Sequence, residues 1–295
     1  MIKVIASDID GTLLNQEHHL CRENIEAIMR ARESGISFLI STGRKYKDVI
    51  RVLESEKLAD GYISLSGAQT VSGNGELLNA IPLAKETVGK VVEYASDYPV
   101  LVILNAMEED YVIGTQTELE EILRSQENIL NGGKSMEKNS DYSLIPMLKK
   151  RTTAVPSLEI LHSKVNAIYK IFIAGEDLEA LARLDQKIRQ IPDADSASSF
   201  VTNLEITHAK AQKGPVLLDF IQKGGYRMDE VMVIGDSMND YSMLSMDYGA
   251  TVAMGNAMEE LKEVAMYVTA DCDHHGVADA INSLLDGNLE SLRKK

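Results

Sequence analysis

Short apolar runs of strand length, each ending abruptly in a polar residue or a glycine, constrain the fold of this chain most. The first lies in KVIASDIDGTLLN, where the β-branched run Ile2–Ser7 leads directly into Asp8. An apolar run of this kind is typical of a strand buried on both faces, as in a parallel sheet covered by helices. Ile36–Ile40 and Gly61–Leu65 repeat the pattern after stretches with helical spacing. We therefore expect neighbouring parallel strands joined by helices.

The same pattern returns near the end of the chain. Val231–Ile234, Ala250–Ala253 and Tyr267–Thr269 are again short and apolar, and helical stretches separate them. These runs predict an α/β fold, a doubly wound Rossmann-like parallel sheet whose core is formed by residues 1–83 and 204–295.

The intervening stretch has a different character and predicts an inserted α/β cap domain over residues 84–203. Its charged helical stretches, Glu86–Ser96 and Thr117–Leu130, alternate with strand-like runs. These runs are Val100–Leu104, Tyr111–Gly114 and Lys170–Ala174. The polar, glycine-rich Asn131–Ser140 is typical of an exposed loop, and Asn74-Gly75 between apolar residues is a hairpin signal.

Length and charge narrow the functions that the chain can have. Its 295 residues exceed the usual size of one domain. A net charge of −15 repels polyanions and argues against nucleic-acid binding. No apolar run is long enough to span a membrane, and the two isolated cysteines, Cys21 and Cys272, form no disulfide framework. We expect a soluble protein of the reducing cytoplasm; the sequence specifies no oligomeric state.

Polar side chains follow the predicted strands at the point where each one ends. They are Asp8 and Asp10, then Ser41-Thr42-Gly43-Arg44, then Ser66-Gly67, and finally Asp236 with Asn239 and Asp240. Since the carboxyl ends of parallel strands meet at one edge of a sheet, these groups should converge. Clustered carboxylates repel one another unless a cation lies among them, and oxygen ligands in an incomplete protein cage favour Mg²⁺.

Several of these residues also have simpler interpretations. Thr42 and Gly43 could cradle a phosphate, or Thr42 could simply cap a helix. Lys213 opens a predicted helix, where a cation is unfavourable, so a phosphate contact is more attractive there than at an ordinary surface lysine. Arg44 could bind a substrate phosphate through two of its guanidinium nitrogens, or pair with an acid on the helix surface.

One further stretch, Asp271–Gly276 (DCDHHG), contains metal-ligating residue types. It lacks paired ligands from elsewhere in the sequence, so a polar loop before the last helix is the better interpretation. The chain contains neither GxxxxGK[ST] nor GxGxxG after a strand, which argues against an ATPase or a dinucleotide enzyme.

Taken together, the motifs resemble those of the haloacid dehalogenase superfamily, specifically its Cof-type (subclass IIB) sugar-phosphate phosphatases. The similar segments are Asp8-Ile9-Asp10-Gly11-Thr12, Ser41-Thr42-Gly43-Arg44, Lys213-Gly214, Gly235-Asp236-Ser237-Met238-Asn239-Asp240, Val252–Ala257 and His274–Ile281. The inserted region matches the family's cap by position and length. Ser66 departs from the family's usual Asn-Gly-Ala, which affects expected substrate contacts more than the chemistry.

The resemblance implies a role for each matched residue. Asp8 would be the nucleophile and a Mg²⁺ ligand; Asp10 would act as general acid/base and give its backbone carbonyl to the metal. Asp236 would complete the metal site, and Asp240 would support the metal loop. Thr42, Lys213, Asn239 and the backbone of Ile9 and Gly43 would bind the phosphoryl group, with Arg44 as a substrate contact.

A Mg²⁺-dependent phosphatase of small phosphorylated metabolites is therefore expected, acting through an aspartyl-phosphate intermediate. Phosphoryl transfer mainly needs in-line positioning and charge neutralisation, which these residue types can supply. A phosphomutase or phosphotransferase on the same fold is an alternative. A noncatalytic phosphosugar-binding regulator is another, although binding alone does not need both Asp8 and Asp10.

Overall fold

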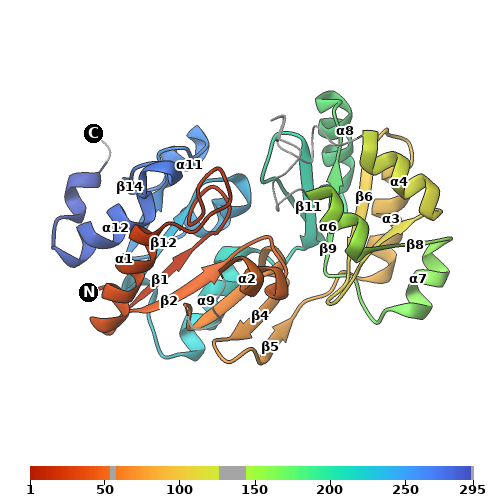
Figure 1. Ribbon diagram of the computed structural model, residues 1–295. Coiled ribbons are helices and arrows are strands. Elements are labelled where there is room, and N and C mark those ends of the chain that lie inside the picture. The colour runs from red at the N-terminus through yellow and green to blue at the C-terminus, as the bar shows by residue number, and fades with distance from the viewer. Residues whose placement is uncertain (54–57, 126–143, 294–295) are drawn as a thin grey trace. The chain divides into compact units, whose positions relative to one another are not determined.

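The computed structural model describes residues 1–53, 58–125 and 144–293 (Figure 1). The chain divides into two compact units: Met1–Ala80 with Ala211–Lys295, and Ile81–Lys210. Among the described residues, no helix has both the length and the apolar character needed to cross a bilayer.

The first unit is built on an eight-stranded sheet in the order β14-β13-β12-β1-β2-β3-β4-β5. Its strands are β1 (Val4–Ser7), β2 (Ser37–Ser41), β3 (Gly61–Ser64), β4 (Gln69–Ser72), β5 (Leu77–Ala80), β12 (Val231–Gly235), β13 (Ala250–Ala253) and β14 (Tyr267–Val268). Strands β14 to β3 are parallel, as the apolar runs predicted. Every residue of β1, β3, β12 and β13 is buried, which explains why these strands read as continuous apolar runs.

Strand order reverses at the centre of this sheet. The chain moves outward from β1 to β2 and β3 on one side, and from β12 to β13 and β14 on the other. Ser7 of β1 is in register with both Ile234 of β12 and Ile40 of β2, so the three strands end side by side. Such a reversal is where α/β sheets bind ligands, beyond the carboxyl ends of the strands.

The predicted hairpin is confirmed and extends the sheet with two antiparallel strands. Strand β4 pairs with β3 and β5 in antiparallel orientation, and the turn contains Asn74 and Gly75. Gly75 has φ 84°, the left-handed conformation that such turns require.

Helices connect the parallel strands of the first unit. They are α1 (Arg22–Glu33), α2 (Tyr46–Leu53), α9 (Lys213–Lys223), α10 (Tyr241–Leu244), α11 (Glu259–Val264) and α12 (Gly276–Leu285). Helices α1 and α12, from opposite ends of the sequence, pack against each other (Figure 1). Buried Asn24 fixes this pair, because its side chain accepts a hydrogen bond from the Ala278 N–H and donates one to the Leu13 carbonyl.

The second unit has its own six-stranded sheet in the order β10-β11-β9-β6-β7-β8. The strands are β6 (Leu101–Asn105), β7 (Asp110–Ile113), β8 (Thr152–Val155), β9 (Lys170–Ala174), β10 (Ala194–Ala197) and β11 (Asn203–His208); the helices are α3 (Lys85–Ala95), α4 (Gln116–Ser125), α6 (Leu144–Arg151), α7 (Leu158–Lys164) and α8 (Leu178–Ile188). Separate apolar clusters lie on its two faces, one with Leu104 and Ile171, the other with Ile103 and Val112.

A row of polar residues crosses five strands of this second sheet. Thr207, Lys170, Asn105, Asp110 and Thr152 are successive cross-strand partners, and all five are buried. The Asn105 amide donates to the Asp110 carboxylate at 2.6 Å. The two charged residues of the row, Lys170 and Asp110, have opposite signs and lie on either side of the neutral Asn105.

The second unit covers Ile81–Lys210 in the structure, whereas the sequence predicted an insert over residues 84–203. Strand β11 pairs with β9 of the second unit, so residues 204–208 belong to that unit rather than to the core. β11 reads NLEITH, with apolar residues only at Leu204 and Ile206, so no apolar run marked it as a strand of the insert. The predicted loop Asn131–Ser140 and the end of the predicted helix Thr117–Leu130 lie outside the described residues.

Candidate active site

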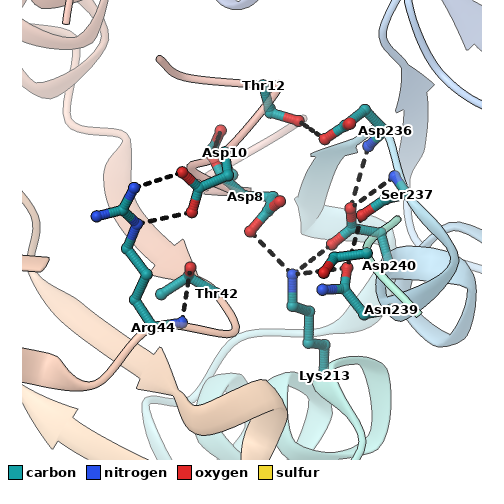
Figure 2. A network of polar contacts seen from close by, with 12 residues as sticks. Asp8, Asp10, Thr12, Thr42, Arg44, Lys213, Asp236, Ser237, Asn239 and Asp240 are labelled. Carbon is teal, nitrogen blue, oxygen red and sulfur yellow. Dashed lines mark hydrogen bonds and ion pairs between the residues drawn. The ribbon is translucent and has the colours of Figure 1, made fainter. Parts of the chain in front are cut away.

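Asp8 and Asp236 leave two adjacent parallel strands at the point of strand-order reversal. Asp8 directly follows β1 and donates its backbone N–H to the Ile234 carbonyl of β12 at 3.0 Å. Asp236 directly follows β12. Figure 2 shows that their side chains approach each other beside Lys213 and Asp240. The sheet register therefore brings together residues 228 positions apart (236 − 8) in the sequence.

Gly11 allows the first loop to reach Asp236. It has φ 73°, and a Cβ atom built there would lie 2.5 Å from the Asp236 Oδ2 atom. Any other residue would therefore clash with Asp236 and strain the backbone. The next residue, Thr12, donates its hydroxyl to the Asp236 Oδ1 atom at 2.6 Å (Figure 2). The Gly-Thr pair thus orients the second carboxylate.

Lys213 is a buried cation at the centre of the site. Its Nζ atom lies 2.9 Å from the Asp8 Oδ1 atom and 2.7 Å from the Asp240 Oδ1 atom. It also donates to the Asn239 Oδ1 atom at 3.3 Å. Burial alone lowers the pKa of Lys213, but the carboxylates of Asp240 and Asp8 raise it above its ordinary value. The lysine therefore stays charged and offsets part of the repulsion among the acids.

Close packing at the start of helix α9 fixes the position of Lys213, its first residue. The backbone N–H of Gly214 donates to the Ser242 hydroxyl at 3.1 Å, and its carbonyl accepts from the Tyr248 hydroxyl at 2.8 Å. A Cβ atom at Gly214 would lie 2.0 Å from the Ser242 carbonyl oxygen. Only glycine allows this approach, which explains the Lys-Gly pair at the start of the helix.

Three carboxylates converge beside the lysine. Oxygen atoms of Asp8, Asp236 and Asp240 all lie within 4.8 Å of one another. Burial, followed by the charge of Asp240, raises the pKa of Asp8 to about 7 even though Lys213 opposes the shift. Burial and the neighbouring Asp8 and Asp240 raise the pKa of Asp236 as well. One lysine does not neutralise three acids, so this donor set suits a divalent cation with oxygen ligands.

Asp240 is already occupied by hydrogen bonds within its own loop. One of its oxygens accepts from Lys213, and the other accepts from the backbone N–H groups of Asp236 and Ser237 at 3.0 and 3.2 Å. It is fully buried. These bonds hold the loop that carries Asp236.

Arg44 pairs with Asp10, a partner that neither sequence interpretation foresaw. Its Nε atom donates to the Asp10 Oδ2 atom at 2.7 Å, and a second guanidinium nitrogen donates to Oδ1 (Figure 2). Burial alone would raise the pKa of Asp10, but Arg44 and then His18 lower it below its usual range. Asp10 is thus held as a carboxylate with its side chain apart from the Asp8–Asp236–Asp240 group.

We expect Arg44→Gln to lower the free energy of unfolding by about 1 kcal/mol at pH 7, because the pair is bidentate but partly solvated. A lowered pKa stabilises the folded state above the unfolded pKa of about 4, and this contribution is lost as pH falls toward the folded value. Urea unfolding at about pH 7 and about pH 3 measures the difference. Arg30→Gln, which breaks the half-exposed pair with Asp286, is the control with little effect. Equal stability of Arg44→Gln and the parent at pH 7 would contradict this result.

The expected phosphate-binding groups lie on the neighbouring loops. Thr42 is buried after β2, and its Oγ1 atom accepts from the Arg44 N–H at 3.2 Å. Within the described part of the chain, no group accepts the Thr42 hydroxyl proton or the Ile9 N–H. Both donors are therefore available to an oxyanion. Gly43 joins Thr42 to Arg44 in the same loop.

The Leu65–Gly67 turn is hydrogen-bonded to the loop that carries Thr42 and Arg44, a contact that the sequence did not predict. The Leu65 and Ser66 N–H groups donate to the Arg44 and Thr42 carbonyls at 2.8 and 3.0 Å. Leu65 and Ser66 both have positive φ, 51° and 58°. Neither is a residue type that favours this conformation, so the sequence did not predict the left-handed backbone, although Ser66-Gly67 marked the end of the strand.

Comparison with known proteins agrees with the motifs. The family model described as haloacid dehalogenase-like hydrolase matches residues 5–281. The chain is 30% identical to the 5-amino-6-(5-phospho-D-ribitylamino)uracil phosphatase YwtE of Bacillus subtilis, over 97% of this chain and 99% of that protein. A haloacid dehalogenase-like hydrolase from B. subtilis superposes with a TM-score of 0.81 at 27% identity, covering 96% of this chain and all of the other.

The fold is also that of BT4131, a sugar phosphatase of haloacid dehalogenase subclass IIB, with a TM-score of 0.75, 24% identity and coverage of 96% and 98% of the two chains. Nearly the whole chain is covered in each comparison, so both units belong to the shared architecture. The chain therefore belongs to the haloacid dehalogenase-like hydrolase family and is a phosphomonoester hydrolase.

Proposed function

We propose that this protein hydrolyses small phosphomonoesters in a Mg²⁺-dependent reaction through an aspartyl-phosphate on Asp8. The observation that carries the proposal is the position of Asp8. Its buried carboxylate meets a buried lysine and a second strand-end aspartate at the point of strand-order reversal. A nucleophilic carboxylate needs such a setting, because it must approach an anionic phosphate.

In the proposed mechanism, Asp8 and Asp10 carry out the reaction in two steps. In the first, an Asp8 oxygen forms a bond to phosphorus while the bond to the substrate's alkoxide breaks, and Asp10 gives that oxygen a proton. In the second, Asp10 takes a proton from water, which attacks phosphorus and releases Asp8 and inorganic phosphate. Because Arg44 holds Asp10 ionised, Asp10 has to leave this pair and take a proton from solvent before the first step, and it regains a proton from water in the second.

Phosphate oxygens would be held by groups on three loops. The Lys213 ammonium, the Thr42 hydroxyl and the Ile9 and Gly43 N–H groups are the donors that we assign to this role, with Asn239 beside Lys213. These donors are fixed before the substrate arrives, which is how charge that develops in a transition state is best stabilised.

The metal would be held by Asp8, Asp236 and the backbone carbonyl of Asp10, with Asp240 bracing the loop. The oxygen-only donor set and its raised pKa values fit Mg²⁺. When bound, the ion supplies positive charge that offsets repulsion between Asp8 and the phosphate.

For substrates, we propose sugar phosphates or similar small metabolites. The relative YwtE is named for a phosphoribityl substrate, which is of this class. We assign the choice of substrate to the second unit, which is expected to act as the cap. The chemistry-bearing residues all belong to the first.

The decisive test is a turnover screen across phosphorylated sugars, nucleotides and pyridoxal phosphate, with and without Mg²⁺. Release of inorganic phosphate from a member of the panel supports hydrolysis. Interconversion of sugar-phosphate isomers without phosphate release would show a mutase instead. Binding without turnover would show a regulator and overturn the proposal.

Metal binding should depend on pH. Because the pKa of Asp8 is raised to about 7, its protonated form favours the metal-free folded state. This contribution is complete below the unfolded pKa of about 4 and is lost as pH rises through about 7. We therefore expect Mg²⁺ to raise the melting temperature more at about pH 8 than at about pH 5, since protons compete with the ion. Asp236→Asn is the control that should lose most of this shift; an equal shift at both pH values would contradict it.

A further inference from the structure

A second group of metal-ligating side chains lies outside the proposed hydrolase site. Cys21, Glu23 and His275 each offer one ligand atom, and the three atoms lie within 4.8 Å of one another. Cys21 and Glu23 belong to the start of helix α1, whereas His275 directly precedes α12. Packing of these two helices brings Cys21 and Glu23 next to His275 of DCDHHG. The sequence alone did not indicate these additional ligands.

The distances between the ligand atoms suit a tetrahedral ion. The Cys21 Sγ atom lies 3.2 Å from the His275 Nδ1 atom, and the Glu23 Oε2 atom lies 3.7 Å from the same nitrogen. Zinc–ligand bond lengths give tetrahedral edges of about 3.6 Å for S···N and about 3.4 Å for N···O. The observed values fall within about 0.4 Å of these edges, an adjustment that small side-chain rotations supply.

Charge and access also suit a divalent ion at this position. One thiolate and one carboxylate balance the charge of the ion, and the neutral imidazole adds none. The His275 and Glu23 side chains are 44% and 54% exposed, so an ion can enter and retain water as a fourth ligand. The mixed sulfur, nitrogen and oxygen donors favour zinc or a similar first-row metal over Mg²⁺.

Hydrogen bonds hold the backbone that carries these ligands in place. Asn24, next to Glu23, is hydrogen-bonded to Ala278 of α12, which fixes the starts of the two helices relative to each other. Asn256 connects the loop before His275 to the loop that follows Asp8. Its side chain accepts a hydrogen bond from the Cys272 N–H and donates one to the Gly11 carbonyl. A metal here would join segments 254 residues apart in the sequence.

From these observations we propose that Cys21, Glu23 and His275 form a zinc-class metal site that fastens the start of α1 to the start of α12. The site is separate from the Asp8 centre and goes beyond the proposed hydrolase function. Binding of the ion replaces the Cys21 thiol proton, which is released to solvent.

The test is titration of the full-length protein with Co²⁺ in excess Mg²⁺, followed by near-ultraviolet absorption. A thiolate-to-cobalt charge-transfer band is expected, because Cys21 ligates the ion and the Asp8 centre contains no sulfur. Zn²⁺ should abolish the band by displacement and protect Cys21 from alkylation. Absence of the band, with Cys21 equally reactive in the presence of Zn²⁺, would overturn the proposal and show only a hydrogen-bonded trio.

Two variants test the ligands Cys21 and His275, and a third is the control. Cys21→Ser should remove the band, whereas Cys272→Ser, at the buried second cysteine, should keep it. His275→Asn should weaken Co²⁺ binding at least about tenfold, because it removes a ligand while asparagine tolerates the left-handed backbone of φ 60°. A band that survives Cys21→Ser, or unchanged affinity in His275→Asn, would contradict this assignment. Phosphatase turnover of Cys21→Ser in Mg²⁺ reports on the hydrolase proposal separately.

Discussion

Asp8→Asn is expected to reduce phosphatase turnover by about a thousandfold or more, the largest effect of any single substitution in this chain. The amide of asparagine carries no charge and is a poor nucleophile toward phosphorus. Steady-state release of phosphate from p-nitrophenyl phosphate, followed at saturating Mg²⁺, measures the loss. Asp219→Asn, on the exposed surface of α9, is the matched control and should leave turnover unchanged.

Comparing two variants distinguishes the role of nucleophile from the role of metal ligand. Asp236→Asn should require more Mg²⁺ and recover part of its rate when the metal concentration rises. Asp8→Asn should not recover at any Mg²⁺ concentration. Rapid acid quenching with a phosphorus-labelled substrate should leave label on the parent protein and none on Asp8→Asn. Parent-like turnover by this variant would refute the nucleophile assignment.

Lys213→Met is expected to lower the free energy of unfolding by about 3–5 kcal/mol as well as turnover. The lysine side chain is completely buried between Asp8 and Asp240, whose side chains are 4% and 0% exposed. Its loss leaves those two carboxylates close together without a cation, and methionine replaces only the apolar volume.

Urea unfolding in the absence of divalent metal measures this effect, and Lys223→Met is the matched control. Lys223 lies at the other end of the same helix, and its ion pair with Asp219 is exposed, so its removal should cost no more than about 0.5 kcal/mol. Saturating Mg²⁺ should narrow the gap between Lys213→Met and the parent. Equal unfolding midpoints for these two proteins without metal would show that the buried lysine is not needed to neutralise the acids.

The central strands could be predicted because burial on both faces leaves a direct mark on the sequence. Strands such as β1 and β12 are apolar at almost every position and end at Asp8 and Asp236. Strands β8 and β10 carry no such mark. β8 reads TTAV and β10 reads ADSA; both are edge strands of their sheet, and Thr152 of β8 belongs to the polar row. Hydrophobic pattern alone therefore located the sheet of the first unit better than that of the second.

The positions of the candidate site residues followed from the fold, whereas their pairings did not. Parallel register is enough to bring Asp8 near Asp236. The contact between Arg44 and Asp10 depends on side-chain rotamers and on a left-handed turn at Leu65 and Ser66, for which the residue types gave no signal.

Long-range helix packing escaped prediction for a similar reason. The proximity of Cys21 to His275 is set by the packing of α1 against α12. No periodicity within either helix encodes that neighbour.

The two sheets share no strand, although one continuous segment, Ile81–Lys210, interrupts the chain that builds the first. Replacing or reshaping this segment would break no backbone hydrogen-bond ladder of the eight-stranded sheet. Exchange of the whole insert between relatives is thus topologically permitted. Under the substrate role that we propose for this segment, such an exchange would alter substrate preference and leave Asp8, Lys213 and Asp236 in place.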